Sequence, residues 1–370
     1  MRFPEFTGEW QKHKLCNIAS IVGRIGFRGY TTNDIVAKGK GAIALSPTNI
    51  ENNRLTYDKD NTYISFYKFE ESPEIMIKQG DVVFVKTGST VGKVAYVDKL
   101  MCKTTLNPQL IVLKNIQCDN YLLSVLMSTS RFQNAIRKIT VGGAVPTLSQ
   151  AAMGDIAVTM PQVAEQEKLS KFISLLDKRI ATQNKIIEKY ESLIKGIAQG
   201  IAHSNKSNVR ISECLECSSS TLQESEVWES GYYPVYGANG IVGYLDNYNT
   251  QSEAIYIIKD GSGVGTVSYV TGKCSATGTL SILQAKKGYS LQYLYYLLKV
   301  FNFEPYKTGM AIPHIYFKDY GKAKIFCPSY SEQIRYANLL SIIDDKLSEE
   351  QKIRTNFGLQ KQYLLRQMFI

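Results

Sequence analysis

The chain has 370 residues, of which 44% are hydrophobic and 21% charged, a balance typical of a folded protein of two or three domains. No stretch approaches the ~18 to 20 apolar residues that a membrane-spanning helix needs, and the seven cysteines stand at irregular spacings; we therefore expect a cytoplasmic protein without a membrane span or a secreted disulfide framework. The formal net charge is +10, and residues 1–161 carry +6 of it, an excess compatible with either a polyanionic partner or an ordinary basic surface.

Residues 1–160 contain short runs rich in Val and Ile, among them DVVFVK, KVAYV and LIVL, separated by clusters of Gly, Asn, Asp and Ser. This pattern predicts short strands joined by many turns. A stretch with helical character, NYLLSVLMSTSRFQNAI, interrupts the strands. Residues 204–328 repeat the plan with AIYIIKDGSGVGTVSYV, TLSILQA and LQYLYYLLKVF. We predict an α+β globule in each segment.

Each globule is followed by a segment with the pattern of a long helix. From Leu169 onward, apolar residues alternate at spacings of three and four, interrupted only by Gln183, which is the pattern of a coiled-coil seam. Neither helix can bury such a stripe alone, so we predict that the two pair, with Glu350 opposite Gln183 in a polar layer that fixes register. The predicted seam residues are Ile173, Leu176, Ile180, Gln183 and Ile187 in the first helix and Leu340, Ile343, Leu347, Glu350 and Phe357 in the second.

The two halves of the chain are built on one plan. Residues 142–180 align with residues 309–347 at a constant offset of 167 positions. Identical residues at this offset include Gly142 and Gly309, Pro146 and Pro313, Pro161 and Pro328, Glu165 and Glu332, Gln166 and Gln333, and Asp177 and Asp344. The sequence therefore indicates a tandem duplication, with a globule over 1–161, a helix over 162–203, a second globule over 204–328 and a second helix over 329–370.

A glycine-rich phrase occurs in both globules, as KTGSTVGKVAYV at 86–97 and as KDGSGVGTVSYV at 259–270. The first lacks the spacing of a phosphate-binding P-loop, and the second lacks the spacing of a dinucleotide fingerprint and leads into a strand-like run. We predict strand–turn–strand hairpins whose glycines adopt positive φ. In the functional interpretation these turns present side chains suited to phosphates and base edges, namely Lys86, Ser89, Thr90 and Lys93 in the first globule and Lys259 and Ser262 in the second.

Three further residues are candidates for contacts with bases or a ligand. Tyr236 and Asn239 lie in GYYPVYGANGIVGYLDNY (231–248), the stretch densest in tyrosine. The alternative for this stretch is packing in the core or in a loop. His314 follows Pro313 in a predicted loop, and an ordinary surface histidine is the alternative there.

The sequence shows no recognisable catalytic arrangement. NPQL at 107–110 resembles the N-P-P-aromatic motif of adenine methyltransferases, but Gln109 and Leu110 do not fit it. Cys214 and Cys217 form a lone C-x-x-C without a second pair, which favours reduced thiols over a zinc site. We therefore expect no catalytic residues and no metal site.

Several motifs, taken together, resemble those of one family. They are GEW near the start, TGSTVG, and GGAVPTLSQ before MPQVAEQEKLSKFISLLDKRI in the first half, then YPVYGANGIVGY, GSGVG and GMAIPHIYFKDY in the second. Through them the chain resembles the specificity subunit of type I restriction-modification systems over essentially its whole length. The recurring P-x-x-x-E-Q helix entry is the most specific part. Thr147 departs from the histidine that commonly follows the proline in this family, whereas His314 keeps it.

The resemblance implies two target-recognition domains that each read one half of a split double-stranded DNA site, and two helices that pair antiparallel as a ruler. It further implies that the helices dock two modification subunits, which bind S-adenosylmethionine and methylate adenine. Restriction subunits using ATP and Mg²⁺ would complete a DNA-cleaving complex, and the chain itself would hold no cofactor and perform no catalysis. Because the two globules differ in sequence, the expected DNA site is asymmetric.

Two alternatives from other classes stay open at this point. A structural coiled-coil scaffold would show no sequence preference for DNA. An enzyme that uses the Gly88 or Gly261 loop on a nucleotide would bind ATP or NAD saturably.

Overall fold

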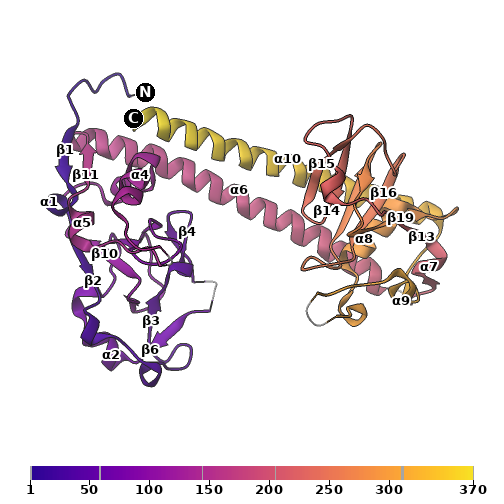
Figure 1. The fold of residues 1–370 in the computed structure, drawn as a ribbon, viewed down its shortest axis with the longest axis horizontal. Helices are drawn as coiled ribbons and strands as arrows, with labels where there is room; N and C mark the ends of the chain where they lie inside the picture. Colours follow the sequence, from indigo (N-terminus) through magenta and orange to yellow (C-terminus); the bar gives the residue numbers. More distant parts are fainter. Residues whose placement is uncertain (1, 58–59, 144, 205, 310–311, 370) are drawn as a thin grey trace. The chain divides into compact units, whose positions relative to one another are not determined.

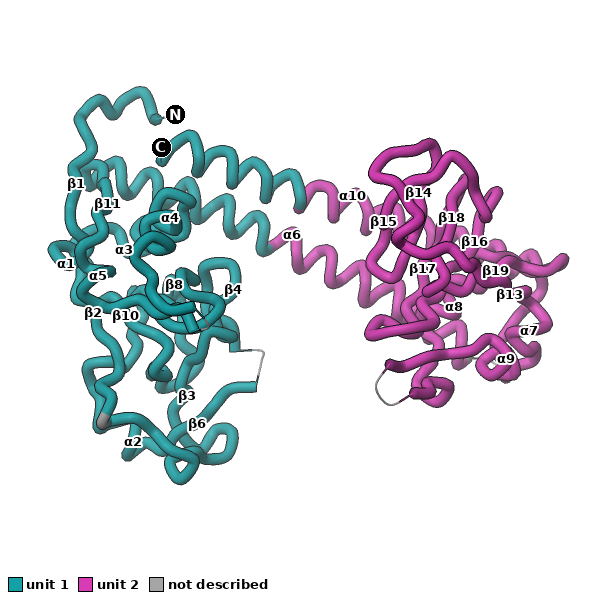
Figure 2. The backbone as a smooth tube through the Cα atoms, viewed as in Figure 1, with its two compact units in different colours: residues 1–181, 355–370 teal, residues 182–354 magenta. Residues whose placement is uncertain are grey.

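The computed structural model describes residues 2–57, 60–143, 145–204, 206–309 and 312–369. The chain divides into two compact units (Figure 2): unit 1 comprises residues 1–181 and 355–370, and unit 2 comprises residues 182–354. Two long helices, α6 (Val163–Ser204) and α10 (Tyr330–Met368), each contribute residues to both units. The remainder of each unit is a mixed α+β globule (Figure 1), which confirms the predicted fold class.

Short strands build the globule of unit 1. Its main sheet has the order β2 (Ser20–Gly23), β10 (Leu110–Lys114), β7 (Val82–Val85), β8 (Val94–Tyr96), β5 (Arg54–Leu55) and β4 (Ile50–Glu51). Beside it stand the sheet of β6 (Thr62–Ile64), β3 (Ala42–Leu45) and β9 (Thr104–Leu106), and the pair β1 (Gln11–Lys14) and β11 (Ala157–Met160). Strand β7 is buried along its whole length, which explains its continuous apolar run in the sequence.

Helices cover the sheets of unit 1. They are α1 (Leu15–Ile18), α2 (Phe66–Glu70), α3 (Asn120–Ser128), α4 (Ser130–Ile139) and α5 (Gln150–Gly154). Phe84 of β7 and Leu113 of β10 pack in one core cluster with Leu122 of α3 and Ile173 of α6. The long helix is therefore part of the core of this unit.

Unit 2 is assembled from a similar set of elements. Its main sheet has the order β13 (Leu215–Ser219), β19 (Leu280–Ala285), β16 (Glu253–Ile258) and β17 (Val267–Thr271). The other strands form the sheet β15 (Gly240–Leu245), β14 (Tyr233–Gly237) and β18 (Ser275–Ala276), and the pair β12 (Val209–Arg210) and β20 (Lys324–Ile325). The helices are α7 (Ile211–Cys214), α8 (Leu291–Val300) and α9 (Phe317–Tyr320). Ile257 and Leu294 share a core cluster with Ile194 of α6 and Leu340 of α10.

The two globules share one topology. The order β2-β10-β7-β8 in unit 1 matches β13-β19-β16-β17 in unit 2, and β6-β3-β9 matches β15-β14-β18. A parallel pair stands at the same place in both, β3 with β9 and β14 with β18. The internal repeat predicted from the sequence is therefore a structural repeat. Elements β4, β5, α2 and α4 of unit 1 have no counterpart among the described residues of unit 2.

The long helices α6 and α10 run side by side (Figure 1). In unit 1, Asp177 of α6 forms an ion pair with Lys361 of α10, and the Arg179 guanidinium lies 4.6 Å from the ring centroid of Phe357. Residue numbers rise along one helix as they fall along the other, so the pairing is antiparallel.

The predicted polar layer of the seam lies in unit 2. Gln183 Nε2 donates to the carbonyl oxygen of Glu350 at 3.2 Å and also to its carboxylate. Of the predicted seam residues, Ile173, Gln183, Leu340 and Leu347 are buried, and Leu176, Ile180, Ile187, Ile343, Glu350 and Phe357 are half-buried. A buried amide that must find a partner fixes the relative register of the two helices.

The recurring glutamine at the start of each long helix has the same role in both units. Gln166 Oε1 accepts a hydrogen bond from the backbone nitrogen of Asp119, the N-cap of α3, at 2.8 Å. Gln333 Oε1 accepts from the backbone nitrogen of Ser290, the N-cap of α8, at 2.9 Å. Each glutamine also donates to the carbonyl of the proline that precedes its helix. The glutamine thus fastens the long helix to the globule beside it.

The glutamate that precedes each of these glutamines differs in role between the units. Glu165 is fully buried and accepts from Arg2 Nε at 2.7 Å and from Trp10 Nε1 at 3.3 Å. Glu332 is exposed and accepts from the Ser329 hydroxyl at 2.6 Å and from the Ser329 backbone nitrogen at 3.2 Å. The recurring glutamate therefore accepts buried hydrogen bonds in unit 1, whereas in unit 2 it caps the N-terminus of α10.

Candidate nucleic-acid interface

The recurring glycine phrases form the predicted hairpin turns. In unit 1 the turn joins β7 to β8, and Gly88 and Gly92 have φ values of 106° and 99°. In unit 2 it joins β16 to β17, and Gly261 and Gly265 have φ values of 97° and 91°. Residues with a Cβ rarely adopt such angles, so these positions require glycine. A strand follows each turn, whereas both nucleotide motifs need the N-terminus of a helix there.

Two other segments bond to the hairpin turn of unit 1 through their backbones. Gly88 N donates to the carbonyl of Pro146 at 2.9 Å, and the carbonyl of Lys86 accepts from Leu148 N at 2.8 Å. Lys86 N donates to the carbonyl of Gln109 at 2.9 Å. Three segments distant in the sequence therefore meet at one place. We call residues 86–93, 107–109 and 146–148 turn cluster 1.

Unit 2 repeats this arrangement bond for bond. Gly261 N donates to the carbonyl of Pro313 at 3.0 Å, and the carbonyl of Lys259 accepts from Ile315 N at 3.0 Å. Lys259 N donates to the carbonyl of Thr279 at 3.0 Å. We call residues 259–266, 277–279 and 313–315 turn cluster 2. Residues 144 and 310–311 of the neighbouring motifs GGAVPT and GMAIPH lie outside the described part of the chain.

The turn clusters contain most of the residues predicted to contact a nucleic acid. Turn cluster 1 holds Lys86, Ser89, Thr90 and Lys93, and turn cluster 2 holds Lys259, Ser262 and His314. Ser89, Lys93 and Ser262 are exposed, and the other four side chains are half-buried. The lysine before the first glycine and the serine after it occupy matching positions in both clusters.

Tyr236 and Asn239 lie instead on the β14–β15 hairpin. The ring of Tyr236 packs against Tyr256 with ring centroids 5.9 Å apart, and burial raises the pKa of its phenol. Its carbonyl accepts from Thr277 N at 2.9 Å, which joins this hairpin to turn cluster 2. Asn239 is exposed at the tip of the hairpin. The Tyr236 ring thus contributes to packing.

One pair of facing positions differs between the turn clusters. In turn cluster 2, His314 Nδ1 lies 2.7 Å from Asp260 Oδ1, and the Tyr316 ring stacks on the histidine with centroids 6.5 Å apart. The matching positions in turn cluster 1 are Thr147 and Thr87, which keep the same backbone bridge. Thus where Thr147 stands in place of a histidine, the facing residue is Thr87 in place of an aspartate.

A second difference involves residues that the sequence did not single out as contacts. Asn107 Nδ2 donates to Gln109 Oε1 at 3.1 Å in turn cluster 1. At the matching positions of turn cluster 2, the hydroxyls of Thr277 and Thr279 are 2.8 Å apart. An alignment of NPQL with TGTL, 170 positions later, would have marked this turn as part of the repeat.

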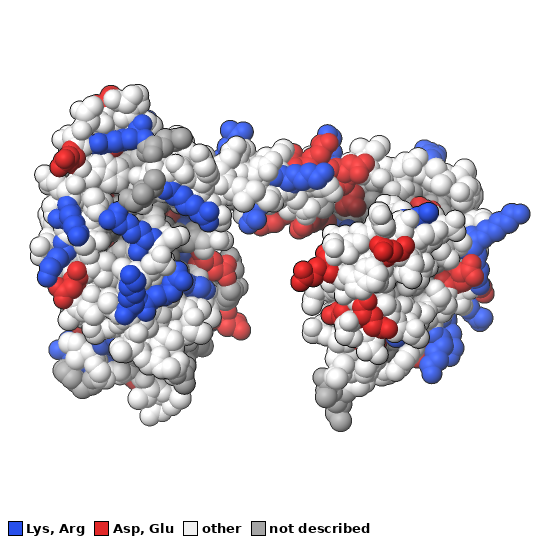
Figure 3. All heavy atoms as spheres, turned by 45° about the horizontal axis from the view of Figure 1, so that its top comes forward, with Lys and Arg blue, Asp and Glu red and all other residues white. Residues whose placement is uncertain are grey.

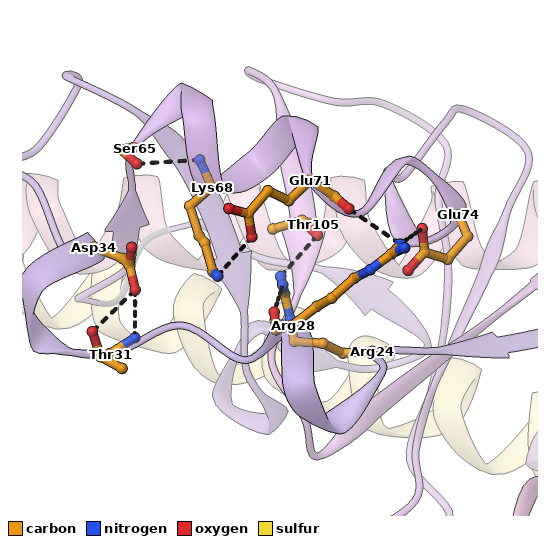
Figure 4. Close-up of polar contacts among 9 residues, drawn as sticks. All are labelled: Arg24, Arg28, Thr31, Asp34, Ser65, Lys68, Glu71, Glu74 and Thr105. Carbon is orange, nitrogen blue, oxygen red and sulfur yellow. Dashed lines mark hydrogen bonds and ion pairs between the residues drawn. The ribbon is translucent and has the colours of Figure 1, made fainter.

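A buried cation supports turn cluster 1 (Figure 4). Arg24 is 7% exposed and donates to the carbonyl of Leu106 at 2.9 Å, the carbonyl of Arg28 at 3.1 Å and the hydroxyl of Thr105 at 3.2 Å. Burial lowers the pKa of Arg24. Arg28 in turn forms an ion pair with Glu74 at 3.6 Å. These contacts hold the strand that leads into the Asn107–Gln109 turn.

Unit 2 supports the same strand with a neutral side chain. Asn249 Nδ2 donates to the carbonyl of Ala276 at 3.2 Å, and Asn249 Oδ1 accepts from Ala276 N at 3.1 Å. Asn249 N donates to the Ser275 hydroxyl at 3.1 Å. Ser275 and Ala276 match Thr105 and Leu106 of unit 1. The guanidinium of Arg24 and the amide of Asn249 thus bond to matching carbonyl groups, those of Leu106 and Ala276, in the two units.

The charge of the two units differs in the way the sequence indicates. Figure 3 shows Lys and Arg side chains gathered over the visible face of unit 1. On the visible face of unit 2, Asp and Glu side chains stand among uncharged residues, and Lys and Arg side chains are seen mainly along one edge. The segments 1–161 and 204–328 carry +6 and +1 respectively. Attraction of a polyanion by long-range charge is therefore stronger at unit 1.

The long helices expose large apolar side chains away from their seam. In unit 1 these include Leu175, Leu359 and Tyr363, which are 55%, 59% and 58% exposed. In unit 2 they include Leu193, Leu339 and Ile342, which are 47%, 48% and 63% exposed. The predicted seam residues are buried or half-buried, whereas these outer residues are exposed and therefore accessible to a partner. The 3,4 spacing of the sequence identifies only the seam positions and therefore did not predict these outer residues.

Within the described residues, no three His, Cys, Asp or Glu side chains are grouped so that they could hold a metal ion. Cys214 of the C-x-x-C lies beside Cys327, with the sulfur atoms 3.9 Å apart. In the same part of the chain, no helix combines the length and the apolar character needed to cross a bilayer.

Sequence comparison adds a family assignment. A model of the family described as Type I restriction modification DNA specificity domain matches residues 8–192 and 204–355. The Type I restriction enzyme EcoprrI specificity subunit of Escherichia coli is 26% identical over 131 residues, which is 35% of this chain and 33% of that protein. The aligned segment thus spans about a third of the length of this curated relative.

Solved structures share the fold over nearly the whole chain. The S subunit of a type I restriction-modification system from M. genitalium has a TM-score of 0.65 at 16% identity, covering 100% of this chain and 99% of that one. A structure described as showing complex assembly and conformational transition of the type I R-M system has a TM-score of 0.52 at 15% identity, covering 99% and 98%. The chain therefore belongs to the type I restriction modification DNA specificity domain family, and its fold is that of the S subunits.

Proposed function

We propose that the chain reads a bipartite, asymmetric DNA site, one half with each unit, and carries the modification and restriction subunits that act on that DNA. The observation that supports this most is the pair of turn clusters, which share their backbone hydrogen bonds and differ in side chains. Both half-sites present the same sugar-phosphate backbone and different bases. Matched groups suit contacts to the backbone, and unmatched groups suit the bases.

The matched groups have the chemistry of phosphate contacts. Lys86 and Lys259 precede the first glycine of each turn, and Ser89 and Ser262 follow it. Lysines and hydroxyls are common donors to phosphate oxygens, and each neutralised phosphate releases condensed counterions. These residues therefore position each unit on the duplex without selecting a sequence.

The outer apolar residues of the long helices suit the docking of modification subunits. Leu175 and Ile342 occupy the same position of the repeat, and both are more than half exposed. Successive residues of an α-helix are rotated by about 100° around its axis. On this basis, the exposed apolar residues of both helices are displaced from the seam in the same rotational direction. Because the helices are antiparallel, the same direction of displacement places these residues on one face of the helix pair. Each unit thus offers a similar apolar face, which suits two copies of one partner.

No chemical step is assigned to the chain in this proposal. S-adenosylmethionine would be bound by the modification subunits, and ATP with Mg²⁺ by the restriction subunits. The glycine turns run into β8 and β17, which disfavours the rival nucleotide-binding enzyme because its phosphate site needs a helix N-terminus.

A methylation map tests the proposal. The chain would be expressed with its modification subunit in a host free of DNA methylation, and N6-methyladenine would be located by sequencing. The expected result is one motif of two specified halves and an unspecified spacer, absent when the chain is omitted. An active modification subunit in an intact complex without any motif would contradict DNA reading and favour the structural coiled-coil scaffold.

A further inference from the structure

Gln109 is an exposed side chain that is nevertheless held in place. Its Oε1 accepts from Asn107 Nδ2 at 3.1 Å, and its backbone nitrogen donates to Asn107 Oδ1 at 2.9 Å. Asn107 itself is only 9% exposed. The carbonyl of Gln109 accepts from Lys86 N at 2.9 Å, and a Cβ on Gly88 would stand 3.5 Å from Gln109 Nε2. The amide therefore lies at the junction of the hairpin turn and the Asn107–Gln109 turn.

This position changes its chemistry between the units while the backbone around it stays the same. In turn cluster 2 the matching residue is Thr279, whose hydroxyl lies 2.8 Å from that of Thr277. In both units the side chain is thus oriented by a partner two residues earlier. One unit presents a carboxamide and the other a hydroxyl. A preorganised group of variable chemistry on an invariant backbone is what recognition of two different half-sites requires.

We propose that Gln109 reads an adenine in the half-site bound by unit 1, through the N6 amino group and N7 of the base in the major groove. The inference rests on the proposed function, which it deepens by naming a base and a residue. Lys86 and Ser89 stand in the same turn cluster, and contacts from them to the backbone would set the register of the amide.

The chemistry of a carboxamide selects adenine among the four bases. Gln109 Oε1 has a second lone pair beyond the bond from Asn107, and Nε2 carries two donor hydrogens. Adenine offers a donor at N6 and an acceptor at N7, which a glutamine can bind with both groups. Guanine offers two acceptors at the same edge, so Oε1 would face an oxygen or nitrogen lone pair there. Thymine and cytosine each lack one half of the pattern.

The test uses the complete complex and the methylation map. Gln109→Ala, Gln109→Glu and the unaltered chain would each be expressed with the modification subunit, and the methylated motif would be determined for each. In the unaltered complex one half-site should contain a specified A·T pair that depends on Gln109. Gln109→Ala should relax that single position, with a loss of roughly 10- to 100-fold in discrimination.

Gln109→Glu separates base reading from a merely structural role. A carboxylate accepts hydrogen bonds and donates none, so the preference at that position should move from adenine towards cytosine, whose N4 amino group is a donor. The other half-site is an internal control, because unit 2 reads it with unaltered residues. Thr279→Ala should change only that other half-site, and Gln117→Ala, at an exposed glutamine outside the turn cluster, should change neither.

The outcomes are distinct. Relaxation by Gln109→Ala and a shift by Gln109→Glu, both confined to one position of one half-site, support the inference. An unchanged motif in both variants overturns it, as does loss of methylation at all positions by both variants in an intact complex. If the unaltered complex itself yields no motif, the proposed function fails before Gln109 is at issue.

Discussion

Unit 1 and unit 2 solve the same structural problem with different residues. Their strand orders match and their turn clusters share the same backbone hydrogen bonds. Yet Arg24 in unit 1 and Asn249 in unit 2 support the corresponding strand, and Thr87 and Thr147 replace the pair of Asp260 and His314. The shared backbone bonds and apolar core thus tolerate different polar side chains at several positions, whereas the glutamine at the start of each long helix is the same in both units.

The units also differ in what is added to the shared topology. Unit 1 places β4 and β5 between β3 and β6, whereas β14 and β15 of unit 2 are joined by a short turn. Unit 1 also carries α4 after α3. These additions lie in the connections between shared elements and leave the shared sheet order intact. Insertions in connections destabilise a fold least. The proposed reading of two unlike half-sites thus requires only changes outside the shared sheets of one duplicated fold.

Burying a charge in the seam should have the largest effect on either unit. Ile173 and Leu340 occupy the same repeat position and are each 1% exposed. Ile173→Asp and Leu340→Asp should each lower the free energy of unfolding by about 4 kcal/mol or more, measured by chemical denaturation. Lys171→Asp and Asn338→Asp, a matched pair at exposed positions, should change it by less than about 0.5 kcal/mol. A large loss in only one seam variant would show that the two units do not depend on the seam equally.

Substituting the exposed apolar residues of the long helices should weaken the binding of modification subunits without lowering the stability of the fold. Leu175→Asp and Ile342→Asp should each leave the unfolding midpoint nearly unchanged but weaken one modification-subunit site by roughly 2 to 4 kcal/mol. Mass measurement of the complex in solution should then show one modification subunit fewer. Retention of both subunits by the double variant would argue against this face as the docking surface.

Removing the shared glutamine should have a smaller, equal effect in both units. Gln166→Ala and Gln333→Ala each leave the backbone nitrogen of an N-cap residue without its acceptor, which costs about 1 to 3 kcal/mol. Thermal unfolding followed by circular dichroism would report the change, with Gln199→Ala, an exposed glutamine of α6, as the control. A smaller loss for Gln166→Ala than for Gln333→Ala would mean that the buried Glu165 contact compensates in unit 1, and a larger loss would contradict an equal role of the two glutamines.

The sequence by itself determined the features that depend on local pattern. The 3,4 spacing predicts both long helices, because apolar positions recur once per turn of a helix. The repeated glycines predict both hairpin turns, because positive φ excludes most other residues. The constant offset predicts the duplication, and the motifs around it predict the family.

Only the tertiary structure decided which distant residues meet. Turn cluster 1 joins residues 86–93, 107–109 and 146–148 through backbone bonds, which are made by any residue type and leave no trace in the composition. For the same reason the role that we propose for Gln109 could not be inferred from NPQL alone. The sequence repeat did not reveal the shared role of Arg24 and Asn249. These two residues lie at different places in their units, yet each donates to the matching carbonyl. Spacing along a sequence encodes local geometry, whereas a site assembled from three segments depends on how the whole unit packs.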